Sequence, residues 1–194
     1  MEKKIIGFLG PSYVGKSTLI QYFTSNGPFT CMPIHTNRPR RHNEVDPNIL
    51  FESTNSMCRF LESPEYICHR IARYYYSIEV AEVEKYLKKY HVIIGFTPAT
   101  IVDYQKVFND MFTVLVWPDD FRVLQIELLA SKERPMAEKM ERINMNEDLK
   151  KNMPSVDYTI INRFINDEIA RTERFGEIMH DLINALDKTI HLSE

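Results

Sequence analysis

A glycine-rich stretch near the start of the chain, FLGPSYVGKSTL (8–19), constrains the fold more than any other feature. From Gly10 to Ser17 it reads Gly-x-x-x-x-Gly-Lys-Ser, which is the full pattern of a phosphate-binding loop. Such a loop follows a buried strand and opens a helix. The apolar run 4–9 predicts that strand, and 17–24 predicts that helix. The stretch therefore indicates an α/β fold built around a strand, a loop and a helix.

The residue types of this loop suit the phosphates of a nucleoside triphosphate. Glycines let consecutive N–H groups turn toward phosphate oxygens, and the helix directs the positive end of its dipole at them. Lys16 can bridge the β- and γ-phosphates, and the Ser17 hydroxyl can ligate Mg²⁺. The predicted nucleotide-binding residues are Gly10, Pro11, Ser12, Tyr13, Val14, Gly15, Lys16, Ser17 and Thr18.

Strands and helices alternate along most of the remaining chain. Apolar runs predict strands at 91–96, 112–117 and 158–161, and periodicity and capping predict helices at 77–90, 99–108, 118–129, 136–151 and 167–186. This alternation favours a parallel sheet covered by helices on both faces. The region from 31 to about 56 is rich in Pro, Arg and Asn without sustained periodicity, so we expect it to be irregular or to have short edge strands. The irregular block 31–76 as a whole is expected to be an insertion on the core.

Composition limits which partners and which cellular compartment we expect for this protein. The net charge of -3 disfavours nucleic acid as a partner. No apolar run approaches the roughly 20 residues that a membrane span needs. Cys31, Cys58 and Cys68 are odd in number without paired spacing, which indicates reduced thiols in the cytoplasm. The scattered histidines form no metal pair at helical spacing, which disfavours structural zinc.

The glycine loop does not identify the group that receives the phosphoryl group. Three classes of protein remain: a switch GTPase that hydrolyses the nucleotide, an ATPase that uses hydrolysis for mechanical work or transport, and a kinase with a small acceptor. A switch GTPase would carry an Asn-Lys-x-Asp guanine reader, which this sequence lacks. A motor or transport ATPase would end an apolar strand in a carboxylate, whereas the run 91–96 leads into Thr97. Asp119 and Asp120 follow a proline and are interpreted as a helix cap. A kinase acting on a small acceptor remains.

The insertion offers a second anion site. Arg38, Arg40 and Arg41 lie within one short stretch, and arginine presents a planar fork that matches phosphate oxygens. Downstream, RYYYS (73–77) supplies phenol and hydroxyl donors. A solvated basic loop with packed aromatic residues is the alternative for each stretch alone. Together, in a chain with a phosphate-binding loop, they favour a phosphate-bearing acceptor.

These motifs resemble the guanylate kinase family of nucleoside monophosphate kinases. GPSYVGKSTL is similar to that family's glycine loop, and IHTNRPRRHNEVD is similar to its acceptor segment, with Arg38, Arg41 and Glu44 in step. RYYYSIEVAEVEKYL resembles its Asn-Tyr-Tyr-Gly segment with the following helix. ERIN (141–144) and DYTIIN (157–162) resemble its post-lid helix and last strand.

The resemblance implies a single P-loop kinase domain with ATP and Mg²⁺ as cofactors. It divides the chain into a core (1–32, 90–130 and 140–194), an acceptor-binding insertion (33–89) and a lid (131–139). It implies catalytic roles for Lys16, Arg134 and Arg142, with Lys132 as a further charge in the lid, and a metal-ligating role for Ser17. The acceptor would be held by Arg38, Arg41, Glu44, Tyr75 and Ser77.

The sequence departs from the family where the family reads its base. The family's guanine-reading Glu falls nearest to Cys68, and its two strand Asp residues become Gly95 and Thr97. A thiol cannot accept two N–H groups as a carboxylate does. GMP or dGMP is the acceptor that the resemblance implies, with the base preference open. A ribose bisphosphate-type phosphokinase, a catalytically weak binding module and a nucleic-acid-end kinase stay as alternatives, and the oligomeric state is not predicted.

Overall fold

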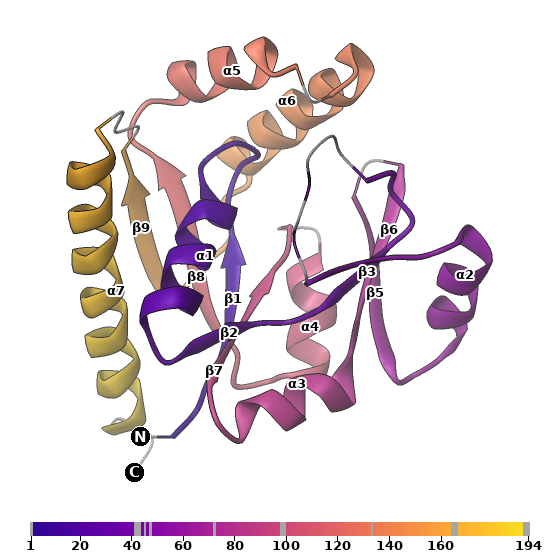
Figure 1. Cartoon of the computed structure of the whole chain (residues 1–194), viewed down its shortest axis with the longest axis horizontal. Coiled ribbons are helices and arrows are strands. Elements are labelled where there is room, and N and C mark those ends of the chain that lie inside the picture. Colours follow the sequence, from indigo (N-terminus) through magenta and orange to yellow (C-terminus); the bar gives the residue numbers. More distant parts are fainter. Residues whose placement is uncertain are drawn as a thin grey trace.

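A five-stranded parallel sheet forms the centre of the molecule, in the strand order β2-β7-β1-β8-β9 (Figure 1). The computed structural model describes residues 2–40, 44, 46, 48–71, 73–97, 100–132, 134–163 and 167–191. The strands are β1 (Ile5–Leu9), β2 (Phe29–Cys31), β7 (His91–Gly95), β8 (Phe112–Pro118) and β9 (Tyr158–Asn162). The predicted α/β class is therefore confirmed. The short edge strand β2 was not predicted, because three residues give no measurable periodicity.

Helices cover both faces of this sheet, as predicted. On one face, α1 (Lys16–Asn26) and α7 (Glu168–His191) bury Phe23 and Leu182 against Phe8 of β1. On the other face, α3 (Val80–Leu87) and α4 (Ile101–Val107) pack against the sheet. Alternate residues of each strand thus enter two separate apolar layers. None of the helices in the described ranges is long and apolar enough to cross a membrane.

Two further helices lie beyond the carboxyl ends of the strands. These are α5 (Phe121–Ala130) and α6 (Met136–Lys151), and in Figure 1 they form the top of the molecule. The Asp120 carboxylate caps α5 by accepting a hydrogen bond from the Arg122 amide at 2.7 Å, in agreement with the predicted cap. In open α/β sheets ligands bind at the carboxyl ends of the strands, so α5 and α6 stand where a ligand would be covered.

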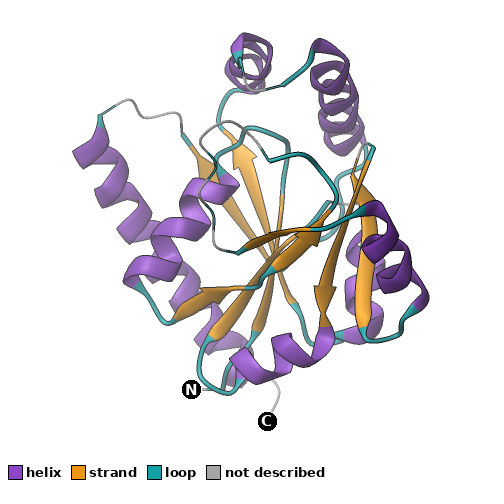
Figure 2. Ribbon diagram, turned by 45° about the vertical axis from the view of Figure 1, so that its right-hand side comes forward, coloured by secondary structure: helices purple, strands orange, loops and turns teal. Residues whose placement is uncertain are grey.

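The insertion contains more regular structure than the sequence predicts. It holds a second, four-stranded sheet in the order β4-β3-β6-β5, with one helix (Figure 2). Its elements are β3 (Ile34–Thr36), β4 (Ile49–Phe51), α2 (Thr54–Glu62), β5 (Tyr66–Ile71) and β6 (Tyr74–Glu79). Of the two expectations for this block, short strands are found, as in β3 and β4, and the described residues are not irregular throughout.

The helix predicted at 77–90 also needs a correction. Ser77 lies within β6, which pairs antiparallel with β5 and extends to Glu79 before α3 begins at Val80. The apolar spacing of Val80, Val83 and Leu87 is helical, but the residues before it form a strand because they complete the hairpin with β5.

Candidate active site

The glycine loop leaves β1 and returns into α1 through backbone conformations that glycine favours. Gly10 has φ 148° and Gly15 has φ 84°, and Tyr13 between them has φ 71°. A Cβ atom added to Gly10 would lie 2.2 Å from the carbonyl oxygen of Val116 in β8. Glycine at this position is therefore needed for close packing against β8 as well as for its conformation.

Lys16 is the first residue of α1, and its side chain returns to the start of the loop. Its Nζ donates hydrogen bonds to the carbonyl oxygens of Gly10 and Pro11, at 2.7 and 2.8 Å. Burial, followed by the charge of Arg142, lowers the pKa of Lys16 to about 7. Ser17 and Thr18 follow it, exposed, in the first turn of α1. A cation and a helix N-terminus thus converge on one side of the loop.

Helix α6 contacts the loop from above. The Ser12 amide donates to Oδ1 of Asn146 at 2.7 Å, and Nη1 of Arg142 donates to the Ser12 hydroxyl at 3.1 Å. The Tyr13 hydroxyl donates to the Ser131 hydroxyl, which lies between α5 and α6. The bond to Ser131 joins the start of the predicted lid to the phosphate-binding loop, and the other two join α6 to it.

One carboxylate holds two of the predicted catalytic residues. Oε1 of Glu138 accepts from Nη1 of Arg134 at 2.5 Å and from Nε of Arg142 at 3.0 Å. Burial alone would raise the pKa of Glu138, but the hydrogen bonds and charges of the two arginines outweigh it and lower that pKa. Arg134 and Arg142 are thus gathered beside the loop, whereas Lys132 is exposed.

The predicted acceptor arginine is buried in the insertion. Arg38 is 7% exposed, and its fork binds both carboxylate oxygens of Glu44, at 2.8 and 2.5 Å. Burial would lower the pKa of Arg38, and the hydrogen bonds and charge of Glu44 outweigh it and raise that pKa. Arg40 is exposed and lies over the Phe51 ring, 4.5 Å from its centroid. Arg41 lies outside the described residues.

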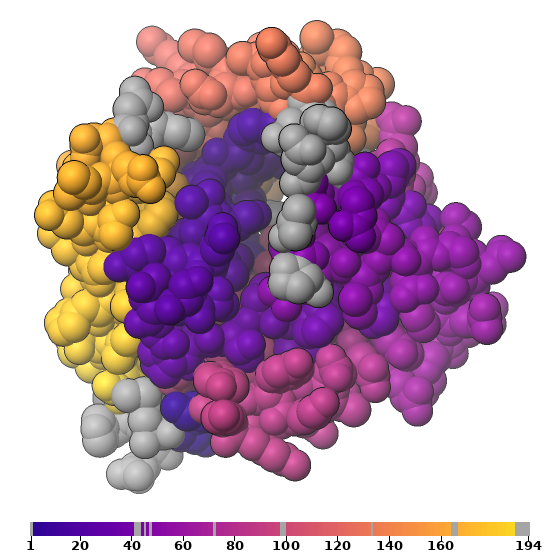
Figure 3. Space-filling model, in the orientation of Figure 1, coloured from indigo at the N-terminus to yellow at the C-terminus, as the bar shows by residue number. Residues whose placement is uncertain are grey.

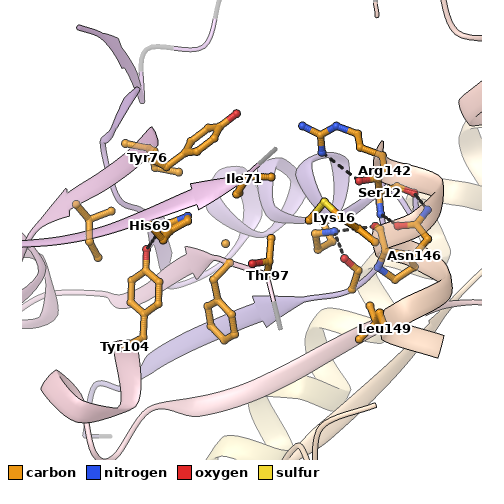
Figure 4. Close-up of a pocket in the computed structure, with 17 residues that line it drawn as sticks. Ser12, Lys16, His69, Ile71, Tyr76, Thr97, Tyr104, Arg142, Asn146 and Leu149 are labelled. Carbon is orange, nitrogen blue, oxygen red and sulfur yellow. Dashed lines mark hydrogen bonds between the residues drawn. The ribbon is translucent and has the colours of Figure 1, made fainter. Parts of the chain in front are cut away.

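A cavity of about 210 Å³ connects the glycine loop with the insertion. Ser12, Lys16 and Arg142 line one end, and His69, Tyr76 and Tyr104 line the other (Figure 4). In the space-filling view a hollow opens between the N-terminal loop region, α5–α6 and the insertion (Figure 3). A phosphate-binding end and an aromatic end thus share one space.

The structure distinguishes among the predicted acceptor residues by strand alternation. Tyr76 and Ile78 of β6 line the cavity, and Tyr75 and Ser77, which alternate with them, do not. In β5 His69 and Ile71 line the cavity, and Cys68, the nearest match to the family's guanine-reading Glu, is not part of the lining. Across the hairpin Cys68 pairs with Ser77, and His69 pairs with Tyr76. The first pair is therefore absent from the cavity lining and the second pair is part of it.

Three polar residues of the cavity were missed by sequence reasoning: His69 of β5, Tyr104 of α4 and Asn146 of α6. Tyr76 of β6 belongs to the predicted RYYYS stretch, but Tyr75 and Ser77 were chosen from it as the acceptor residues. The alternation of β5, in which Ile67 and His69 are buried and Arg70 is exposed, is the signal that could have identified His69. Asn146 is 1% exposed in the middle of the polar helix α6. A buried polar residue does not follow from an amphipathic pattern, so the sequence gives no signal for it.

A second cavity, of about 510 Å³, lies on the other side of the loop. Gly15 and Thr18 border it together with Asp119, Asp120 and Asn162. Nδ2 of Asn162 donates to the Val14 carbonyl at 2.6 Å, and its Oδ1 is buried without a hydrogen-bond partner among the described residues. The loop is thus flanked by a cavity on each side.

The comparisons with known proteins agree with the fold. The structure is similar to the crystal structure of guanylate kinase from Anaplasma phagocytophilum, with a TM-score of 0.64 over 93% of this chain and 87% of that chain. The two sequences are 13% identical over this match. No protein-family model matches the sequence, and the search of curated proteins finds no relative. The likeness therefore establishes the fold, and the function has to be argued from the site.

Proposed function

We propose that this chain is a kinase that transfers the γ-phosphoryl group of ATP to the phosphate of a small acceptor, a nucleoside monophosphate. The observation that carries the proposal is the shared cavity, which places Lys16 and Arg142 at one end and an aromatic pocket at the other. A phosphate-binding loop alone is compatible with many enzymatic functions. A phosphate-binding loop beside a second binding pocket suits phosphoryl transfer between two bound molecules.

The donor side fits ATP. The loop offers backbone N–H groups and Lys16 to the phosphates, and the cavity beside Gly15 leaves room for the rest of the nucleotide. Mg²⁺ would be held by the Ser17 hydroxyl together with phosphate oxygens and waters, and it would supply charge neutralisation.

The protein's part in the transfer is positioning and electrostatics, so no nucleophile on the protein is needed. Lys16 neutralises charge on the β- and γ-phosphates, and Arg142 sits beside it in the same cavity. Glu138 keeps Arg134 and Arg142 together near the loop. Arg38, oriented by Glu44, does not itself line this cavity. Its place in the insertion makes it the proposed contact of the acceptor phosphate.

The direct test is a screen of ATP consumption against nucleoside monophosphates and sugar phosphates. We expect ADP to form only when a phosphorylated acceptor is present, and the acceptor to gain one phosphate. Phosphoryl transfer to a sugar phosphate alone would favour the phosphokinase alternative. Hydrolysis of ATP without any acceptor would contradict transfer.

A binding module is the second candidate, and one observation favours it. A Cβ atom added to Gly95 would meet no atom within 4 Å, so this position at the cavity has room for the family's carboxylate and lacks it. A binding module would take up the acceptor without consuming ATP. Both candidates fit a cytoplasmic protein with the free cysteines Cys31, Cys58 and Cys68.

ATP binding should be coupled to proton uptake through Lys16. With a pKa of about 7, the Lys16 amine is mostly neutral at pH 8 in the free protein. The phosphates favour its charged form, so we expect uptake of close to one proton per ATP at pH 8 and much less at pH 6. Calorimetry in buffers of different ionisation enthalpy measures this uptake. Lys16→Arg, which is charged throughout, should abolish it, and the same uptake in that variant would assign the proton to another group.

A further inference from the structure

The aromatic end of the cavity is built around a buried histidine. His69 of β5 is 7% exposed and its ring is nearly parallel to that of Tyr76, at 5.8 Å between centroids and 13° between planes. Nδ1 of His69 lies 3.2 Å from the hydroxyl of Tyr104, which is fully buried in α4. The Phe96 ring stacks on Tyr104 at 5.4 Å. These rings fix His69 in one orientation, with the edge away from Tyr104 directed into the cavity (Figure 4).

The contact with Tyr104 decides which nitrogen of His69 carries the hydrogen. Among the described residues, Nδ1 of His69 is the hydrogen-bond partner of the Tyr104 hydroxyl. If Tyr104 donates to Nδ1, both groups are satisfied; the reverse would leave a buried phenol hydrogen unpaired. Burial raises the pKa of Tyr104 and lowers that of His69 to about 4, so the phenol is protonated and the imidazole is neutral at pH 7. His69 therefore presents Nε2–H to the cavity.

A single N–H donor in an apolar surrounding has a definite chemical preference. No Asp or Glu is among the described residues that line the cavity, and Ile34, Ile78 and Phe96 border the same space. Guanine could accept from Nε2–H through O6, but without a carboxylate in the described lining its N1–H and N2–H groups would have only the hydroxyls of Tyr76 and Thr97 as side-chain acceptors at this end of the cavity. Uracil has one edge N–H, at N3, where guanine has three, so the penalty is smaller for uracil.

The size of the cavity points the same way. Its volume of about 210 Å³ is below the ~300–1,000 Å³ that is usual for ligand pockets. A single ring is therefore favoured over the two fused rings of a purine.

We infer that this cavity takes the base of a pyrimidine monophosphate, with a ring carbonyl or ring nitrogen accepting from Nε2 of His69 and the ring lying along Tyr76. Tyr104 acts as a positioning residue, because it holds the tautomer of His69 through Nδ1. The inference rests on the proposed kinase function for its substrate class. It is tested by binding rather than by turnover, so that the two can fail separately.

The experiment is calorimetric titration of the whole protein with UMP, CMP, GMP and AMP in the absence of ATP. We expect UMP or CMP to bind at least about 10-fold more tightly than GMP, the factor that one unpaired buried donor corresponds to. His69→Phe keeps the ring and removes the donor, and it should weaken pyrimidine binding by about 10-fold. His69→Glu supplies an acceptor and should shift the preference toward GMP.

Two comparisons separate recognition from a structural effect. Cys68→Ala changes the neighbouring residue, which does not line the cavity, and should leave the preference unchanged. The ¹⁵N shifts of His69 should show the Nε2–H tautomer in the wild-type protein, and Tyr104→Phe should release the other tautomer. A purely structural Tyr104 would leave the tautomer as it is.

The outcomes distinguish this inference from the proposed function. Equal or tighter binding of GMP or AMP by the wild-type protein, no binding of any of the four nucleotides, or unchanged UMP binding in His69→Phe would overturn the role of His69. Selective pyrimidine binding without any phosphoryl transfer would support the pocket and refute the kinase. Efficient transfer to GMP, with pyrimidines bound more weakly, would support the kinase and refute the pyrimidine pocket.

Discussion

Lys16→Ala is expected to lower the rate of phosphoryl transfer by at least about 100-fold, the usual effect of removing one preorganised charge at a developing negative centre. Nζ of Lys16 lies between the carbonyls of Gly10 and Pro11 and lines the cavity shared with Arg142. No other lysine is among the described residues of that lining, so the lost charge is not replaced by a neighbour of the same kind. Steady-state kinetics with ATP and the best acceptor measure the effect.

The fold should survive this substitution. The bonds that Lys16 gives up are to two carbonyls at the cavity, and its burial already disfavours its charge. The thermal midpoint should therefore change little. Lys85→Ala, an exposed lysine on α3, is the control and should leave the rate unchanged. Wild-type turnover in Lys16→Ala would refute the assignment of the phosphate-binding loop.

The sequence predicts best where one short segment determines its own geometry. The spacing of Gly10, Gly15 and Lys16 is sufficient because the positive φ angles and the close contact with Val116 are local requirements of a strand, a loop and a helix. Helix α6 was predicted with its bounds at 136 and 151, because Pro135 marks its start and Pro154 follows its end.

The insertion was predicted less well because its order comes from pairing between distant residues. Strand β3 pairs with β4 and with β6, so none of these short segments is stable or recognisable by itself. Polar residues in them suggest a loop, although His35 and Thr36 are fixed by their partners across the sheet. Such context overrides local preference.

The acceptor residues show the limit of motif alignment in a strand. A shift of one residue moves a side chain to the opposite face of the sheet. The family pattern points to Cys68, Tyr75 and Ser77, and the cavity is lined instead by His69 and Tyr76. Tyr104 is in a different element, α4, and no linear motif connects it with His69. Only the folded arrangement reveals that pair.

Arg38→Ala should have a large effect on stability. The Arg38 side chain is 6% exposed and that of Glu44 is 13% exposed, so the substitution removes a bidentate ion pair that is largely buried. Loss of one partner from a buried ion pair lowers the free energy of unfolding by about 3–5 kcal/mol. Urea denaturation measures this change. Arg40→Ala is the matched control, because Arg40 is exposed, and it should change the free energy by less than about 1 kcal/mol.

The ion pair does not use all the donors of Arg38. Nη1 binds Glu44 and the Pro39 carbonyl, and Nη2 binds Glu44 once, so within the described residues Nε–H and one Nη2–H are left for the acceptor phosphate. Arg38→Lys keeps the charge, so it should fold better than Arg38→Ala, but it loses the planar fork. We expect it to raise the acceptor KM by about 10-fold or more, the effect of one charged hydrogen bond, with the KM for ATP nearly unchanged. A folded Arg38→Lys protein with a normal acceptor KM would show that Arg38 serves only to hold Glu44. Loss of ATP affinity instead would mean that donor and acceptor do not occupy the two separate ends of the site proposed above.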